Sequence, residues 1–272
     1  MPDIQFNKTR IAPTPSGFLH LGNALSFLIT ASLAKKTGAQ LLLRIDDMDK
    51  QRVNEAYLQD IFDTLAFLQI NWDEGPRNVS DIKTQWSQLH RLGIYHGMLE
   101  ELKQKNAVYA CQCSRTQIIN CKCDKLELPL DIPNVSWRLR TKNEKPIHIK
   151  TLENGIIKTT LPEDMNDFIV RKKDGYPAYQ LTSVADDIHF GVDLVVRGED
   201  LWRSTIAQHY LADVLESEGF KNITFHYHGL IMGGGEKKLS KSAGDTSIKY
   251  LREQGGTLSD VLKNTSIDEY LV

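Results

Sequence analysis

One segment of the sequence has the residue types of a phosphate-binding turn. Residues 10–23 read Arg-Ile-Ala-Pro-Thr-Pro-Ser-Gly-Phe-Leu-His-Leu-Gly-Asn, and helical spacing begins directly after them. A helix N-terminus has about four unpaired N–H groups and roughly half a unit of positive charge, so phosphates bind there. His20 in the first turn can add a hydrogen bond. The alternative is a proline-rich turn that only starts a helix.

A second segment places two lysines next to a run of glycines. This lysine segment reads Gly-Gly-Gly-Glu-Lys-Lys-Leu-Ser-Lys-Ser over residues 233–242. Lys238 and Lys241 can approach a polyphosphate, where cations stabilise the charge that develops on a pyrophosphate leaving group. The chain has no P-loop and no G-x-G-x-x-G fingerprint. The alternative is a solvated linker.

All four cysteines of the chain lie between positions 111 and 123, as two C-x-C pairs, Cys111 with Cys113 and Cys121 with Cys123. Two close pairs on one short loop favour tetrahedral thiolate ligation of Zn²⁺. Four protein ligands leave no open coordination position, so such a zinc would order a loop and would not catalyse. The alternative is four reduced thiols without a metal.

The elements that must position these residues alternate between strands and helices. Apolar residues at helical spacing, closed by Gly38, predict a helix over 23–36, and the apolar run 40–46 predicts a strand buried on both faces. Further helices are expected over 54–69, 86–105, 180–187 and 204–216, and further strands over 70–76, 168–171, 193–197 and 224–227. This alternation is typical of a doubly wound, Rossmann-like parallel sheet, which binds ligands at the carboxyl ends of its strands.

Residues 107–165 break the alternation with the cysteines, four prolines and short strand-like runs at 136–140 and 147–150. We therefore expect an inserted α+β zinc-knuckle subdomain over 107–165, with the two halves of the α/β domain over 1–106 and 166–235. Residues 236–272 would hold the lysine segment and the start of a helical extension.

Composition is that of an ordinary globular protein. Of the 272 residues 41% are hydrophobic and 25% charged, and the formal net charge is -2. The sequence has no run of about 18 apolar residues and no apolar signal-peptide core at its start, so we expect a cytoplasmic protein without a membrane partner. Residues 103–150 hold ten Lys or Arg against four Asp or Glu, which suits either phosphate binding or a solvated surface.

The two phosphate-facing segments together resemble the paired signature sequences of class I aminoacyl-tRNA synthetases. The first is His20-Leu-Gly-Asn at the first helix, and the second is Lys238-Leu-Ser-Lys-Ser after the last strand. Six segments spread over nearly the whole chain are similar, in order, to glutamyl-tRNA synthetases, the glutamate branch of this class. They cover residues 10–17, 44–49, 71–76, 174–179, 184–187 and 196–200.

The resemblance implies an amino-acid site for L-glutamate. Arg10 and Tyr179 would hold the side-chain carboxylate, Arg197 would face the α-carboxylate, and Thr14 and Asp46 would bind the ammonium group. The residue chemistry agrees, because a substrate with two carboxylates needs two separated cations and an arginine fork matches a carboxylate bidentately.

The resemblance also implies ATP with Mg²⁺ as the second substrate. His20, Asn23, Lys238 and Lys241 would be the catalytic residues, acting by positioning and electrostatic stabilisation without a covalent nucleophile. The residues expected to contact ATP are His20, Gly22, Asn23, Leu230, Ile231, Lys238, Ser240 and Lys241. His226 and His228 alternate on the preceding strand and are expected to be structural.

Two positions depart from the family's pattern. Asn23 stands where the first signature usually ends in histidine, and Asp46 stands where the family normally has glutamate. Asp46 is one methylene shorter than glutamate. Either the helix packs closer, or a water bridges the gap, or the substrate is a different amino acid. The alternative for Asp46, Asp47 and Asp49 is an acidic turn at a strand end or a Mg²⁺ site.

The sequence stops about thirty residues after Ser242, whereas full glutamyl-tRNA synthetases continue into anticodon-binding helical domains. In this it resembles the glutamyl-queuosine tRNA(Asp) synthetases, so we expect transfer of glutamate to queuosine in the anticodon of tRNA(Asp). The alternatives are a truncated or split glutamyl-tRNA synthetase that charges the 3′ end of tRNA(Glu), a non-catalytic paralogue that binds glutamate or ATP, and a nucleotidyltransferase of the same superfold.

Overall fold

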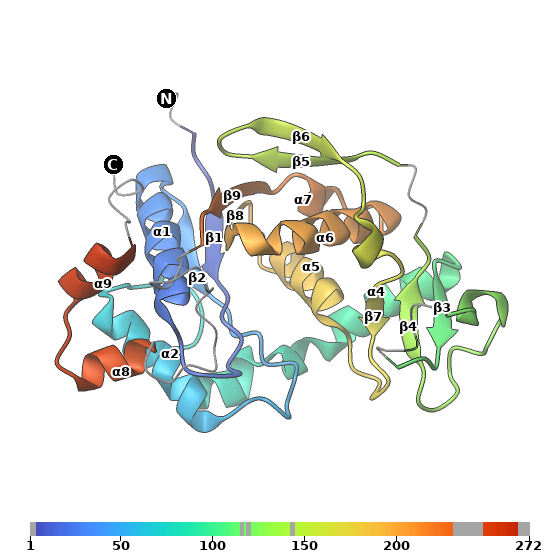
Figure 1. Cartoon of the computed structure of the whole chain (residues 1–272), viewed down its shortest axis with the longest axis horizontal. Helices are drawn as coiled ribbons and strands as arrows, with labels where there is room; N and C mark the ends of the chain where they lie inside the picture. The colour runs from blue at the N-terminus through green and yellow to red at the C-terminus, as the bar shows by residue number, and fades with distance from the viewer. Residues whose placement is uncertain (1–3, 115–116, 118–120, 142–144, 231–246, 266–272) are drawn as a thin grey trace. The chain divides into compact units, whose positions relative to one another are not determined.

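The computed structural model describes residues 4–114, 117, 121–141, 145–230 and 247–265. The chain forms two compact units (Figure 1). The first contains residues 1–90, 192–200 and 225–272, and the second contains residues 91–191 and 201–224. These divisions differ from the expected boundaries, because the chain enters the second unit at Arg91 and returns to the first for strands near residues 194 and 225.

A mostly parallel sheet forms the centre of the first unit. Its strands are β1 (Lys8–Ile11), β2 (Gln40–Leu43), β8 (Leu194–Gly198) and β9 (Thr224–His228), in the spatial order β2-β1-β8-β9. β1 pairs in parallel with both β2 and β8. Helix α1 (Leu21–Thr37) connects β1 to β2 and packs on β1 and β8. The predicted strand-turn-helix-strand unit is confirmed.

Further helices of this unit lie beside and below α1 in the view of Figure 1. They are α2 (Glu55–Phe67), α3 (Val79–Asp81), α8 (Ile248–Glu253) and α9 (Leu258–Thr265); α8 packs on α2, and α9 packs on α1. Turns of π and 3-10 helix follow α3 over Ile82–Trp86 and Gln88–Arg91. The shared core includes Leu43, Ile61, Leu65, Ile248 and Val261, so the helices near the C-terminus belong to the same core as the sheet.

The strand expected over 70–76 is wrong. This segment makes only an isolated bridge, between Leu42 and Glu74. Gly75 explains the difference, because its φ of 117° belongs to a region that favours glycine, and an added Cβ would lie 2.2 Å from the Leu43 carbonyl oxygen. The segment therefore passes close to the backbone of β2 without continuing as a strand.

The second unit includes residues 107–165, the range of the expected insertion, within its longer span of 91–191 and 201–224. A three-stranded antiparallel sheet has the order β3-β4-β7, with β3 (Val108–Cys111), β4 (Ser136–Leu139) and β7 (Ile169–Arg171). A hairpin joins β5 (Ile147–Thr151) to β6 (Gly155–Thr159). Its helices are α4 (Leu92–Gln104), α5 (Tyr179–His189), α6 (Trp202–Val214) and α7 (Glu218–Lys221), with 3-10 turns at Cys123–Lys125 and Glu163–Met165. A further 3-10 turn, Glu199–Leu201, lies where the chain passes from the first unit to the second.

Two details of this unit correct the sequence-based expectation. The strand at 168–171 was expected to resume the parallel sheet, but β7 pairs with β4. The helix expected over 86–105 begins only at Leu92, because Ser87 and Gln88 lie in the preceding turns, and the Gln88 backbone N–H donates to Asp47 at 2.8 Å.

A buried carboxylate ties two helices of the second unit together. Asp186 on α5 accepts two hydrogen bonds from the Arg91 guanidinium, at 2.8 and 3.1 Å, and one from the Tyr95 hydroxyl at 2.7 Å. The Asp186 side chain is fully buried, and such a carboxylate needs this many partners to be tolerated. The cluster fixes α5, which begins at Tyr179, against α4.

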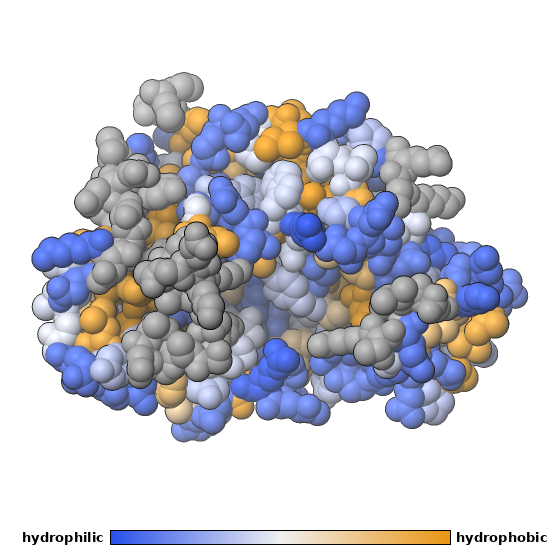
Figure 2. All heavy atoms as spheres, viewed as in Figure 1, coloured by the Kyte–Doolittle hydropathy of each residue, from blue (hydrophilic) through white to orange (hydrophobic). Residues whose placement is uncertain are grey.

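Hydrophilic side chains predominate on the face shown in Figure 2, and the hydrophobic ones form small separate groups. Among the residues that the structure describes, no helix has both the length and the apolar character needed to cross a membrane.

Candidate active site

His20 is the N-cap residue of α1, at the start of the helix that the sequence predicts. Its Nδ1 accepts a hydrogen bond from the Gly22 backbone N–H at 3.1 Å, and its own backbone N–H donates to Asn23 Oδ1, also at 3.1 Å. The two bonds form a capping box. The departure at Asn23 therefore has a structural use, because its amide oxygen fixes the peptide of His20.

The cap also sets the chemistry of the imidazole. Because Nδ1 accepts, a neutral His20 carries its proton on Nε2, which makes Nε2–H a hydrogen-bond donor. Gly22 favours this geometry, since a Cβ at that position would lie 3.0 Å from Cε1 of the His20 ring and would press on the imidazole. The arrangement offers a donor beside the positive end of a helix, which suits a phosphate oxygen.

Two arginines lie on one face of the parallel sheet. Arg10 on β1 pairs with Leu42 of β2, and Thr9 pairs with Leu194 of β8. By this register Arg10 lies opposite residue 195, and Arg197 is two residues further along β8 on the same face. Both arginines are buried, and the Arg197 guanidinium lies 5.4 Å from the centre of the Phe225 ring. Two fixed cations at neighbouring strand ends can orient a substrate with two carboxylates.

Asp46 and the peptide that precedes Thr14 are in direct contact. The Asp46 backbone N–H donates to the Pro13 carbonyl at 3.0 Å. Thr14 itself is exposed, just beyond the end of β1. The structure thus brings together the two residues predicted to bind an ammonium group, at the carboxyl ends of β1 and β2.

Arg44 is a site residue that sequence reasoning missed. Its Nε and Nη2 donate to the two carboxylate oxygens of Asp46 at 2.7 and 3.1 Å, and both side chains are buried. Their spacing in an extended segment, i and i+2, was the available signal, because alternation places both side chains on one side. The pairing holds the shorter Asp46 carboxylate in a fixed orientation.

The turn that follows Asp46 is held from both sides by Gln88. Its side-chain oxygen accepts from the Met48 N–H at 2.8 Å, while its backbone N–H donates to Asp47. Asp49 instead lies 3.5 Å from Arg52. Within the described ranges the three aspartates do not form a cluster that could hold a metal ion, so the Mg²⁺ alternative for them gains no support.

The ends of β8 and β9 meet beside these arginines. Gly198 leaves room for its neighbours, since an added Cβ would lie 2.7 Å from Oδ1 of Asp200 and 3.3 Å from a methyl carbon of Leu230. His228 is buried, its Nδ1 contacts the Gly229 carbonyl at 2.9 Å, and its Nε2 has no partner among the described residues. Burial lowers the pKa of His228, so its ring is neutral, which agrees with the structural role expected for it.

The chain returns to His20 after the lysine segment. Ser247 forms an isolated bridge with His20, and the Ile248 N–H donates to the Leu19 carbonyl at 2.8 Å. The residues predicted to contact ATP at Ile231, Lys238, Ser240 and Lys241 lie outside the described residues. Ser247, which lies beside His20 of the first signature, is six positions after Lys241 in the sequence.

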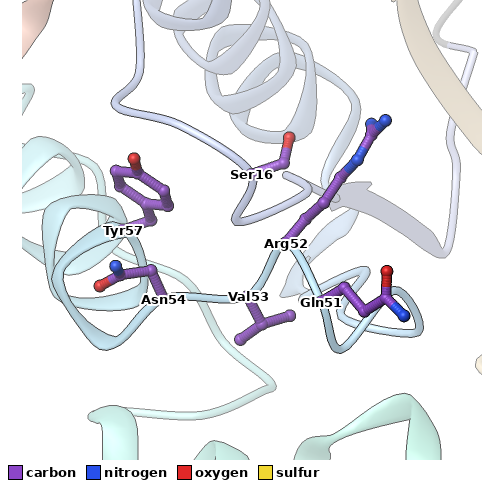
Figure 3. A pocket seen from close by; sticks show the side chains of 6 residues that line it. All are labelled: Ser16, Gln51, Arg52, Val53, Asn54 and Tyr57. Atoms are coloured by element: carbon purple, nitrogen blue, oxygen red, sulfur yellow. The ribbon is translucent and has the colours of Figure 1, made fainter.

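An open pocket of about 500 Å³ lies next to the turn of the first signature (Figure 3). Ser16 lines it from that turn, Gln51, Arg52 and Val53 from the segment after β2, and Asn54 and Tyr57 from the start of α2. The Arg52 side chain extends past Ser16 in this view. The pocket is polar and borders the predicted substrate site.

Tyr179, the remaining predicted glutamate contact, belongs to the second unit. It is the first residue of α5, and 44% of its surface is exposed. The residue is therefore accessible to a ligand, and its contact with the carboxylate that faces Arg10 stays a prediction.

The four cysteines form one cluster in the second unit. None is in a disulfide, and their four sulfur atoms lie within 4.8 Å of one another. The closest Sγ pairs, 111 to 121, 113 to 121 and 113 to 123, are 3.7, 3.5 and 3.7 Å apart. A tetrahedron with Zn–S bonds of about 2.3 Å has S–S edges of about 3.8 Å, so the donor set fits zinc.

The sequence has a match among the known protein families. Residues 7–134 and 131–264 match the family of class I tRNA synthetases (E and Q), catalytic domain. The chain belongs to this family. Its fold is the class I synthetase catalytic fold, α/β with a mostly parallel central sheet, as the sequence predicted.

Individual relatives agree with the family. The chain is similar to glutamate–tRNA ligase 2 of Syntrophus aciditrophicus (strain SB), with 32% identity over 269 residues that cover 91% of this chain and 54% of that protein. Glutamate–tRNA ligase 1 of Thermoanaerobacter sp. (strain X514) is 31% identical over 270 residues, with 91% and 55% covered. The chain spans about half the length of these relatives.

Solved structures show the same fold. The glutamate-tRNA synthetase from Elizabethkingia anophelis superposes with a TM-score of 0.72 and 21% identity, covering 89% of this chain and 54% of that one. A glutamate tRNA ligase from Elizabethkingia meningosepticum, solved in complex with its amino acid, gives a TM-score of 0.71 at 23% identity, with 88% and 52% covered.

Proposed function

We propose that this class I synthetase domain activates L-glutamate with ATP and transfers it to a tRNA. The observation that carries the proposal is the placement of Arg10 and Arg197 on one sheet face of the unit in which His20 caps α1. In the activation step, an oxygen of the glutamate α-carboxylate attacks the α-phosphorus of ATP. The bond from that phosphorus to the bridging oxygen breaks, and pyrophosphate leaves with the electron pair.

The residues take separate parts in this step. Arg197 orients the attacking α-carboxylate, Arg10 with Tyr179 holds the side-chain carboxylate, and Thr14 with Asp46 binds the ammonium group. A bidentate arginine fork distinguishes a carboxylate from an amide, because glutamine would place an N–H₂ group against N–H donors.

ATP with Mg²⁺ occupies the other end of the site in this proposal. The Nε2–H of His20 donates to a phosphate oxygen over Gly22 and Asn23, and Leu230 with Ile231 lines the adenine. Lys238, Ser240 and Lys241 contact the pyrophosphate as its charge develops. Such contacts lower the barrier because they strengthen in the transition state.

Zinc has a structural part. We propose that Cys111, Cys113, Cys121 and Cys123 bind one Zn²⁺ as thiolates. Burial raises the pKa of Cys121 to about 12, and a bound dication reverses this preference for the protonated thiol. The ion would order the loop between β3 and β4 without taking part in the reaction.

The proposal also concerns which RNA accepts the glutamate. Queuosine in the anticodon of tRNA(Asp) is the first candidate, on the sequence resemblance to glutamyl-queuosine synthetases. The 3′ end of tRNA(Glu) is the second, favoured by relatives named as glutamate–tRNA ligases. Both acceptors receive glutamate from the same adenylate, so the activation site does not choose between them.

One experiment separates the acceptors. The purified protein is incubated with ATP and radiolabelled glutamate, and with queuosine-containing tRNA(Asp), the same tRNA lacking queuosine, or tRNA(Glu). We expect base-labile label on queuosine-containing tRNA(Asp) alone. Label on tRNA(Glu) would mean that the 3′ end of tRNA(Glu), and not queuosine of tRNA(Asp), accepts the glutamate. Absence of both label transfer and glutamate-dependent pyrophosphate exchange would contradict the activity and favour a paralogue that only binds its ligands.

A further inference from the structure

Asp60 is a buried carboxylate with two partners from distant parts of the chain. It lies in the middle of α2, beside Ile61, and is 2% exposed. Its Oδ2 accepts from the Leu19 backbone N–H at 3.0 Å, and its Oδ1 accepts from Nη2 of Arg252 at 2.5 Å. Leu19 directly precedes His20, and Arg252 belongs to α8, which follows the lysine segment in the sequence.

The backbone of Leu19, the residue directly before His20, is consequently held from two helices. Asp60 of α2 binds the N–H of Leu19, and the backbone N–H of Ile248, in the first turn of α8, binds its carbonyl at 2.8 Å. Ser247 completes the contact through its bridge with His20. Because Asp60 also binds α8 through Arg252, these contacts form a closed triangle between the first signature, α2 and α8.

Stability alone does not explain a carboxylate at this position. Burial raises the pKa of Asp60, which shows that the site disfavours the charged form. Apolar side chains of similar size often replace buried ion pairs without loss of stability, and Leu58, Ile61 and Leu65 of the same helix belong to the apolar core. A carboxylate, however, can accept from a peptide N–H and a guanidinium at the same time.

We propose that Asp60 is a positioning residue for adenylate formation: through Leu19 and Arg252 it fixes the backbone directly before His20 and the helix α8 in one register. The inference rests on the proposed function, because the register matters only if His20 and the lysine segment act on the same ATP. Misplacement of a catalytic group by about 1 Å can lower a rate by about 10²-fold.

The test measures glutamate-dependent ATP–pyrophosphate exchange in four variants. Asp60→Leu removes both hydrogen bonds with a side chain of similar size, and Asp60→Asn keeps an acceptor for the Leu19 N–H. Arg252→Gln removes the cation. The matched control is Asp63→Asn, since Asp63 lies one turn further along α2, is half exposed, and contacts Arg252 at 3.4 Å without touching Leu19.

We expect kcat to fall at least about tenfold in Asp60→Leu, with the KM for glutamate changed less than about twofold, and an intermediate kcat in Asp60→Asn and Arg252→Gln. Asp63→Asn is expected to match the wild type. A kcat for folded Asp60→Leu within twofold of the control would overturn the inference. If Asp60→Leu does not fold, the same comparison applies to the other two variants.

A second measurement separates this inference from the proposed function. The imidazole NMR signals of His20, assigned with a His20→Gln variant, report the local geometry whether or not the protein is active. We expect them to shift in Asp60→Leu and Arg252→Gln and to stay in place in Asp63→Asn. Unmoved signals overturn the positioning role. Moved signals in a protein without exchange activity would support the positioning of His20 and contradict only the proposed reaction.

Discussion

Replacing Asp46 by asparagine removes one charge from the Arg44–Asp46 pair and leaves its shape unchanged. Both side chains are buried, and the two hydrogen bonds are 2.7 and 3.1 Å long. Breaking such a pair costs about 3–5 kcal/mol, and asparagine still accepts one bond, so we expect the lower end of that range. With a urea m-value of about 3 kcal/mol/M, the unfolding midpoint falls by about 1 M.

The same substitution weakens the proposed ammonium contact. A hydrogen bond to a charged group contributes about 1.5–3 kcal/mol, so the KM for glutamate in pyrophosphate exchange rises by about 10- to 100-fold. The control is Asp49→Asn, because Asp49 is about half exposed and only 3.5 Å from Arg52, an exposed pair that contributes at most about 1 kcal/mol. Equal urea midpoints and equal KM values in the two variants would refute the reasoning.

Three further variants or measurements test other parts of the account. Protein purified without a chelator is expected to contain about one equivalent of zinc by atomic absorption, and Cys113→Ala to lose it; a folded, metal-free wild type would contradict this. Asn23→Ala removes half of the capping box and is expected to lower the free energy of unfolding by about 1 kcal/mol in urea titrations. An unchanged urea midpoint would contradict a stabilising role for the cap. The pKa of His228 is lowered by burial, so on acidification the unfolded chain takes up its proton first, near pH 6.5. The wild type therefore loses more stability than His228→Gln between pH 7.5 and pH 5.5, and equal losses would count against a buried neutral ring.

The parallel sheet and the first signature could be predicted because their signals are local. Gly38 at the end of α1 adopts a φ of 73° that favours glycine, and the apolar run that follows it is typical of a strand buried on both faces. His20 as a helix cap followed from the turn that precedes it.

The remaining contacts depend on tertiary structure. Nothing near Asp60 in the sequence indicates Leu19 or Arg252, which are 41 and 192 positions away. The late start of α4 follows from the bonds between Gln88 and the turn at Met48, and the pairing of β7 with β4 follows from the fold of the second unit. Patterns of apolar residues identify strands, but they do not say which strands pair.

The central claim is that the first unit binds glutamate through two arginines beside a phosphate-binding helix. Its most direct test is ATP–pyrophosphate exchange by the purified wild-type protein without tRNA, with glutamate, with glutamine, and with no amino acid. We predict exchange with glutamate only, and loss of most of it in Arg197→Met, because the α-carboxylate loses its buried cation. Exchange that is independent of glutamate, or equally fast with glutamine, would contradict the account.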